Sequence, residues 1–215
     1  MAVLFTAICG LAADTNAVLD GWLSAQTNLQ TWEADFTQTR SLKALAKPLI
    51  ATGHLHFAVP NRFRWELREP SQTIALRDAG EMWVIYPLLK RAERYSFNEK
   101  TPGEWRETLS LLQTGFPQSR AELDSRFRVV SLSETNGSWQ LTLQPVNAFA
   151  RRMMREITVG LATNDFALTA TEMVFADGSR MRNDFTNAVL NPKIVDEVFR
   201  WQPEADFKIA DPLGK

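Results

Sequence analysis

Apolar and polar residues alternate with a period of two along much of the first hundred residues. The alternation is clearest over 32–37, 54–57 and 63–68, where apolar side chains are separated by charged or polar ones. This period predicts antiparallel strands with one buried face and one face in water. Turn residues separate these stretches, and three further strands fit within 72–97. The first part of the chain is therefore predicted to be a meander of about six strands.

The period of two returns in the second half of the chain. It predicts strands over 126–134, 138–144, 154–161, 166–176 and 179–187. Asn136-Gly137 and Asp177-Gly178 are typical of tight hairpins, because both turns need residues that accept a positive φ. Asn191-Pro192 interrupts the pattern, and a last short strand is predicted from Val198 to Gln202.

Helical spacing appears in three places. The stretch 16–29 predicts a helix whose apolar face is formed by Val18, Trp22, Ala25 and Leu29. The segment Thr101-Pro102-Gly103-Glu104 is a capping box that opens a second helix, with Trp105, Leu109 and Leu112 on one face. Ser119 and Glu122 form a second capping box before a short helix.

These elements predict a mainly β protein of the α+β class. About eleven strands in one antiparallel sheet must curl, which gives an unclosed β-barrel lidded by about three helices. Such a sheet encloses an interior that is filled either by side chains or by a ligand. The composition is consistent with both, since 13 Phe and 7 Trp build an ordinary aromatic core as readily as a ligand cavity.

The N-terminal run is predicted to be an export signal. Residues 1–13 are almost all apolar or small, the run is too short to span a bilayer, and Ala12 or Ala13 suits a cleavage site. No basic residue precedes Arg40, so we expect translation to start upstream of Met1; the alternative is a buried N-terminal helix. Residues 14–215 are predicted to be a single domain in the periplasm, without a thiol, since Cys9 is the only cysteine.

Charge and motifs exclude several functions. A net charge of −1 is unlike a nucleic-acid-binding domain. The chain has no nucleophile elbow, phosphate loop or dinucleotide fingerprint, and its two histidines, His54 and His56, lie two apart on one predicted strand with no third metal ligand. We therefore expect no enzyme activity, no cofactor and no metal.

Several short motifs resemble the LolA family of outer-membrane lipoprotein carriers. They are Phe36-Thr37-Gln38, then Gly53-x-Leu55-x-Phe57-x-x-Pro60-x-x-Phe63-x-Trp65, Pro70, Asp78-x-Gly80-x-x-Trp83-x-x-Tyr86 and a weaker C-terminal block from Asp177-Gly178 to Pro203. The resemblance covers about 32–205 and implies an unclosed barrel around an apolar cavity. It also implies a monomeric carrier that takes an acylated lipoprotein from an inner-membrane ABC transporter to an outer-membrane receptor.

The aromatic face of the meander supplies the expected walls of that cavity. They are Phe36, Leu55, Phe57, Phe63, Trp65, Ile74 and Trp83, although a slip of one residue sends a side chain to the other face. Trp65 and Trp83 are also consistent with plain core packing. The expected lid carries Trp105, Leu109 and Leu112.

One position departs from the family pattern. The best-known carriers have a basic residue before the proline that corresponds to Pro60, and that residue helps to hold the lid closed; here the position is Val59. The departure favours a paralogue that carries another lipid or glycolipid. A periplasmic sensor or adaptor module and a lipid-processing enzyme are the other readings of the same fold.

Overall fold

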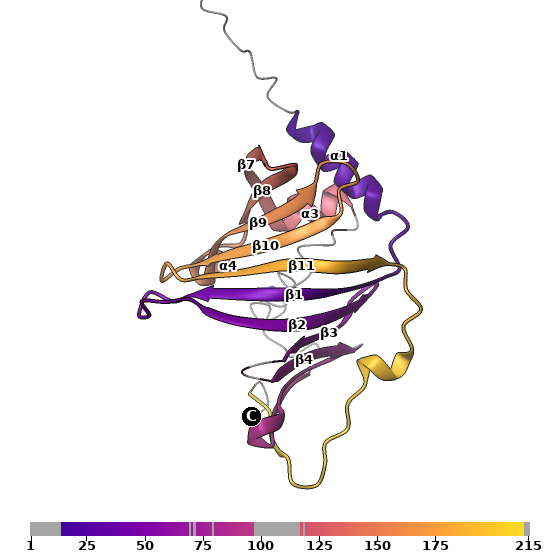
Figure 1. Ribbon diagram of the computed structural model, residues 1–215, viewed down its shortest axis with the longest axis vertical. Coiled ribbons are helices and arrows are strands. Elements are labelled where there is room, and N and C mark those ends of the chain that lie inside the picture. The colour runs from indigo at the N-terminus through magenta and orange to yellow at the C-terminus, as the bar shows by residue number, and fades with distance from the viewer. Residues whose placement is uncertain are drawn as a thin grey trace, which may run out of the picture.

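The computed structural model describes residues 14–68, 70, 72–78, 80–96, 117 and 119–212 (Figure 1). The strands are β1 (Thr31–Ser41), β2 (Leu49–Ala58), β3 (Arg62–Leu67), β4 (Thr73–Asp78), β5 (Glu81–Tyr86), β6 (Arg91–Ser96), β7 (Phe127–Thr135), β8 (Ser138–Pro145), β9 (Met154–Ala162), β10 (Leu168–Phe175), β11 (Arg180–Leu190) and β12 (Lys208–Ala210). The helices are α1 (Thr15–Gln26), α3 (Arg120–Arg126) and α4 (Ala148–Met153), with 3-10 helices η1 (Pro87–Leu89) and η3 (Asp196–Phe199).

The twelve described strands form one curled sheet in the order β12-β6-β5-β4-β3-β2-β1-β11-β10-β9-β8-β7. Figure 1 labels the part of this order from β4 to β7. Two meanders, β1 to β6 and β7 to β11, meet where β1 pairs antiparallel with β11. Only β12, which pairs with β6, is parallel to its neighbour among the described strands. The sheet stays open between β12 and β7, which confirms the predicted unclosed, mainly β fold.

The predicted hairpins have the expected turn chemistry. Asn136 and Gly137 link β7 to β8 with φ of 52° and 72°, values that suit a two-residue turn and that most side chains avoid. Gly178 has φ of 87° between β10 and β11, where the Asp177 side chain accepts a hydrogen bond from the Ser179 amide. Local sequence therefore determines both connections.

One face of the sheet, here called the inner face, carries the main hydrophobic core. Its register aligns Trp32 with Phe57 and Leu55 with Trp65. In the second meander, Leu141 aligns with Val159. Helix α1 contributes Leu19 and Trp22 and α3 contributes Leu123 to the same core. Ala25, expected on the buried face of the first helix, is exposed, because the helix ends at Gln26 and turns Val18, Leu19 and Trp22 inward instead.

A short polar chain crosses the inner face. The side-chain amide of Gln38 on β1 donates to Asn183 Oδ1 on β11 at 3.0 Å, and the Asn183 amide donates to Thr171 Oγ1 on β10 at 3.1 Å. Gln38 and Asn183 are buried. Burying an amide without a hydrogen-bond partner costs free energy. These linked hydrogen bonds therefore stabilise one register where the two meanders meet.

The opposite, outer face carries a second apolar cluster beneath the C-terminal segment (192–212). Leu76, Ile85 and Ala92 point to this face and are buried, as is Phe199 of η3. Arg62 donates to Asp196 at 2.8 Å and its guanidinium lies over the Phe199 ring. The strand predicted from Val198 to Gln202 is wrong: η3 covers its start, and β12 forms later in the segment. Packing across the outer face overrides the short apolar pattern.

Helix α4 is absent from the sequence prediction. Its N-cap, Asn147, accepts hydrogen bonds from the backbone amides of Phe149 at 2.7 Å and Ala150 at 3.1 Å. Replacing Asn147 with alanine leaves two amides without this acceptor, and we expect the free energy of unfolding to fall by about 1 kcal/mol. The urea midpoint measures this loss. Ser133→Ala, at an exposed strand position, is the control and should change it by less than about 0.5 kcal/mol; equal effects at the two sites would contradict the cap.

Candidate functional site

Five of the seven predicted cavity residues lie together on the inner face. Phe36 comes from β1, Leu55 and Phe57 from β2, and Phe63 and Trp65 from β3. The register places Leu55 opposite Trp65 and Phe57 opposite Phe63, so their side chains share one face. All but Trp65 are buried, and Trp65 is half-buried against the main core.

An aromatic cluster forms the centre of this face. The rings of Phe36 and Trp65 are 4.2 Å apart between centroids, and Phe185 of β11 lies 6.4 Å from Phe36 and 6.2 Å from Trp65. Trp32 meets Phe185 edge to face at 5.1 Å. Phe185 was not among the predicted wall residues, because only the pairing of β1 with β11 brings it beside Phe36.

Ile74 and Trp83 lie on the outer face, away from the other five. Ile74 is opposite Glu66 and Ile85, whereas its neighbour Ala75 is the residue opposite Trp65. Trp83 packs against Trp201 of the C-terminal segment at 5.2 Å. Their assignment to the inner wall is therefore corrected: β5 is apolar on both faces and β4 carries Ala75 on its inner face, so the pattern alone selects the wrong parity.

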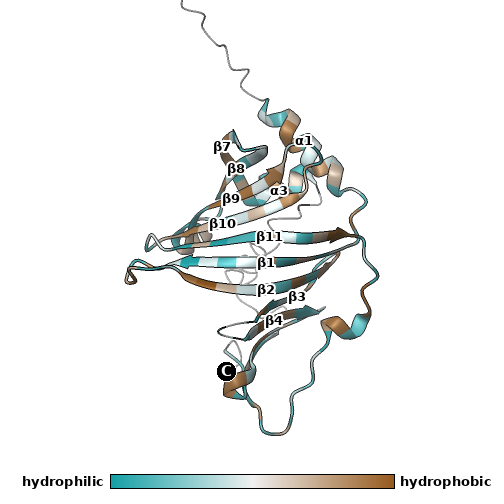
Figure 2. Cartoon of the chain, in the orientation of Figure 1, coloured by the Kyte–Doolittle hydropathy of each residue, from teal (hydrophilic) through white to brown (hydrophobic). Residues whose placement is uncertain are grey.

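One half-buried part of the inner face lies over β3 to β6. We call it the apolar strip, and its residues are Trp65, Leu67, Ala75, Val84 and Tyr95. Each of these side chains packs on the buried core and keeps part of its surface uncovered. Among the described residues, the strip offers an apolar ligand a surface that already rests on a packed core. In Figure 2, brown marks the apolar start of β2, the strand next to β3.

Polar groups border the strip at its β6 side. The Tyr95 hydroxyl donates to Glu93 Oε2 at 2.8 Å, and Arg91 donates to Glu93 Oε1 at 2.6 Å. Burial raises the pKa of the Tyr95 phenol, and the hydrogen bond to Glu93 raises it further. The phenol therefore stays neutral and keeps the proton that it donates. Arg77 also points to the inner face; burial lowers the pKa of its guanidinium, and the charge of Arg126 adds to the effect. The site thus combines an apolar floor with a charged border.

Gly53 lets the aromatic cluster lie close to the backbone. It is opposite Phe36 on β1, and a Cβ atom at Gly53 would lie 2.2 Å from Phe36 Cζ and 2.3 Å from the Glu66 carbonyl oxygen. Only glycine leaves room for the ring, and the ring in turn supports Trp65.

Val59 lies in the turn between β2 and β3. Its side chain packs against the main core, and its amide donates to the Gln30 carbonyl at 2.9 Å. The lid residues Trp105, Leu109 and Leu112 lie outside the described residues. Within the described ranges, no helix combines the length and apolar character needed to cross a membrane.

Comparison with known proteins points to one family. Residues 27–202 match the family described as outer membrane lipoprotein carrier protein LolA. The outer-membrane lipoprotein carrier protein of Methylibium petroleiphilum is 26% identical over 206 residues, covering 95% of this chain and 93% of that protein. That of Leptothrix cholodnii is 27% identical, covering 87% and 78%.

A solved structure shows the same fold. An uncharacterized conserved protein from Thermus thermophilus superposes with a TM-score of 0.54 at 8% identity, covering 91% of this chain and 98% of that one. At this identity the likeness concerns the fold alone.

Proposed function

The chain belongs to the LolA family of outer membrane lipoprotein carrier proteins, and from this premise we propose that it is a periplasmic carrier of acylated lipoproteins. It binds their acyl chains on the inner face of the sheet and shuttles them from the inner to the outer membrane. It acts by binding and release, without catalysis. Residues 1–13 serve as its export signal and 14–215 as the carrier domain.

The observation that carries this proposal is the apolar strip. Half-buried apolar side chains on the inside of a curled sheet can gain contacts from a ligand without the core being rebuilt. Val84 and Trp65 would contact the acyl chain directly, and Phe36 supports the Trp65 ring from below. The charged border at Glu93 and Arg91 suits the polar end of a lipid. The helix that the sequence predicts around Trp105, Leu109 and Leu112 would cover the acyl chain as a lid.

The energetics fit a carrier. Each buried CH₂ contributes about 0.8 kcal/mol, so one acyl chain of about 16 carbons gains roughly 10 kcal/mol before ordering costs. Two or three fully buried chains would exceed practical affinity limits, so the cargo must be held incompletely and released to a tighter-binding partner. An inner-membrane ABC transporter would load a monomeric carrier, and an outer-membrane receptor would unload it.

One observation favours a specialised cargo. At Val59, where the best-known carriers have a basic latch, this chain has an apolar side chain packed on the core. A valine side chain offers no hydrogen-bond donor, so the closed state would lack the several bonds that a guanidinium makes. The alternative is therefore a LolA-like paralogue that carries another lipid or glycolipid.

One experiment with two measurements tests the proposal. The purified protein should show bound lipid by native mass spectrometry and should bind a fluorescent fatty acid in one saturable step. Absence of both would overturn the carrier function. Expression in cells depleted of their general carrier then separates the two cargoes: restored growth supports the lipoprotein shuttle, and lipid binding without restored growth supports the specialised paralogue.

A further inference from the structure

Two histidines and two carboxylates face each other across β1 and β2 on the outer face. The register pairs His54 with Asp35 and His56 with Glu33. Directly opposite residues in an antiparallel pair point to the same side of the sheet, so all four side chains gather in one patch. The sequence shows the two histidines without a third ligand, whereas the β1–β2 register supplies one.

The three potential ligands Glu33, His54 and His56 lie close together. Each offers a nitrogen or oxygen ligand atom within 4.8 Å of those of the other two. His56 Nε2 is 3.7 Å from Glu33 Oε2, and the two imidazole rings are 4.5 Å apart between centroids. Ligands bound to one zinc ion at about 2.0–2.1 Å are roughly 3.3 Å from each other, so small side-chain rotations would complete the site. All three residues are half-buried, which leaves room for such rotations.

His54 is already oriented by a carboxylate. Its Nδ1 lies 2.8 Å from Asp35 Oδ1, and the Asn187 side-chain amide donates to Asp35 Oδ2 at 3.0 Å. When Nδ1–H donates to a carboxylate, the lone pair of the imidazole is on Nε2 and is available to a metal. A carboxylate behind a histidine is the usual outer partner of a metal-bound imidazole.

Within β3, the positive charge beside the histidines is paired with a carboxylate, and Arg68, directly after β3, lies near enough to act on Asp35. On β3, Arg64 is opposite His56 and Glu66 is opposite His54. These two side chains form an ion pair with each other, so the guanidinium charge is balanced locally. A divalent cation beside Glu33 would therefore meet a favourable field.

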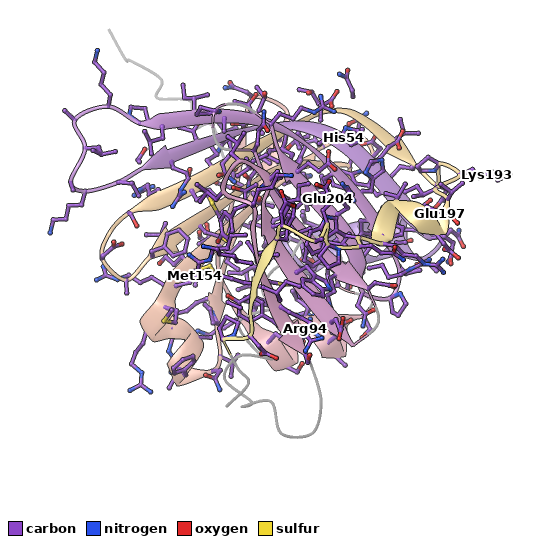
Figure 3. The ribbon with its side chains drawn as sticks, turned by 90° about the horizontal axis from the view of Figure 1, so that it is seen from below. His54, Arg94, Met154, Lys193, Glu197 and Glu204 are labelled. Carbon is purple, nitrogen blue, oxygen red and sulfur yellow. The ribbon has the colours of Figure 1, made fainter. Side chains whose placement is uncertain are left out.

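We propose that Glu33, His54 and His56 bind one borderline divalent transition-metal ion, with Zn²⁺ as the representative ion, and that Asp35 is a positioning residue for His54. Two imidazoles and one carboxylate are a ligand set that zinc accepts, with a fourth position left to water or to a partner. The ion would tie β1 to β2 on the face opposite the apolar strip. Metal binding and lipid binding are therefore separate properties of this chain. His54 is labelled in Figure 3.

Zinc titration of the protein without an affinity tag tests the site. Isothermal titration calorimetry with ZnCl₂ should give one ion per chain, while MgCl₂ should give no binding because hard cations prefer oxygen ligands. His56→Gln and Glu33→Gln each remove a ligand and should weaken zinc binding by about 100-fold. Asp35→Asn should weaken it by about 10- to 100-fold, as expected for an outer partner. Zinc should also raise the Tm of the unmodified protein and leave that of His56→Gln unchanged.

Asp184→Asn is the matched control, because Asp184 lies on the outer face of β11 and pairs with Arg182 away from the histidines. It should leave zinc affinity unchanged. The proposal fails if ZnCl₂ does not bind, or if His54→Asn and His56→Gln bind it as tightly as the unmodified protein. Circular dichroism of each variant distinguishes a lost ligand from a lost fold.

Discussion

Replacing Val84 with glutamate is expected to weaken the binding of a fluorescent long-chain fatty acid by about 100-fold. Val84 lies on the inner face of β5, opposite Ala75 on one side and Glu93 on the other. A carboxylate at this position must lose water when an acyl chain covers it, and it stands beside the like charge of Glu93. A cost of about 2.7 kcal/mol, within the usual range for a buried polar group without a partner, corresponds to that 100-fold loss.

Two further variants make this result specific. Thr37→Glu places the same charge at an exposed position of the outer face and should leave probe affinity unchanged. Val84→Ala removes about two methylene equivalents without adding charge, so affinity should fall by roughly tenfold. If the glutamate disturbs folding, Val84→Ala still tests whether acyl chains contact Val84. If all three proteins bind the probe equally well, acyl chains do not lie on the apolar strip.

Replacing Gly53 with alanine is expected to lower the free energy of unfolding by about 3 kcal/mol, at the upper end of the usual cost of overpacking. The new Cβ would meet both the Phe36 ring, at 2.2 Å from Cζ, and a backbone carbonyl, at 2.3 Å from the Glu66 oxygen. A ring can rotate away, but the carbonyl belongs to the adjacent strand, so β2 and β3 must move apart. Urea denaturation followed by tryptophan fluorescence measures the change.

The control is Thr52→Ala on the same strand, next to Gly53. Thr52 is exposed, so its truncation neither opens a cavity in the core nor crowds a neighbouring strand. We expect its effect to be within about 0.5 kcal/mol. Adding Phe36→Leu to Gly53→Ala should recover part of the loss, because the two residues are in contact and their effects are coupled. An unfolding free energy of Gly53→Ala equal to that of the unmodified protein would contradict the close approach.

Local pattern was sufficient for the strands themselves. The period of two located β1 to β3 and β7 to β11, because each strand has one apolar face and its turns carry residues suited to them. The bounds agree to within a few residues for β3 and β7 to β11, whereas β1 and β2 extend well beyond the predicted 32–37 and 54–57. Helix α3 was likewise predicted by its capping box: the Ser119 hydroxyl oxygen accepts a hydrogen bond from the Glu122 backbone amide at 3.1 Å. Helix α4 escaped prediction because its six residues are too few to establish a helical period.

Parity on β4 and β5 needed the tertiary structure. The sequence Thr73-Ile74-Ala75-Leu76 offers apolar side chains to both faces, since the inner face meets the core and the outer face lies under the C-terminal segment. Neither the residue types nor their spacing along the chain shows which of the two faces is the inner one. Cross-strand register decided that Ala75 and Val84 point inward, whereas Ile74 and Trp83 point outward.

The sequence by itself determined strands β1 to β11, the two tight hairpins, the family, and five of the seven residues expected on one apolar face: Phe36, Leu55, Phe57, Phe63 and Trp65. Those are properties of neighbours along the chain or of motifs within it. The position of Phe185 beside Phe36, the outward Trp83 against Trp201, and the gathering of Glu33 with His54 and His56 were decided only by the fold. Each depends on contacts between strands or segments, and side-chain alternation along one strand carries no information about the register of the next.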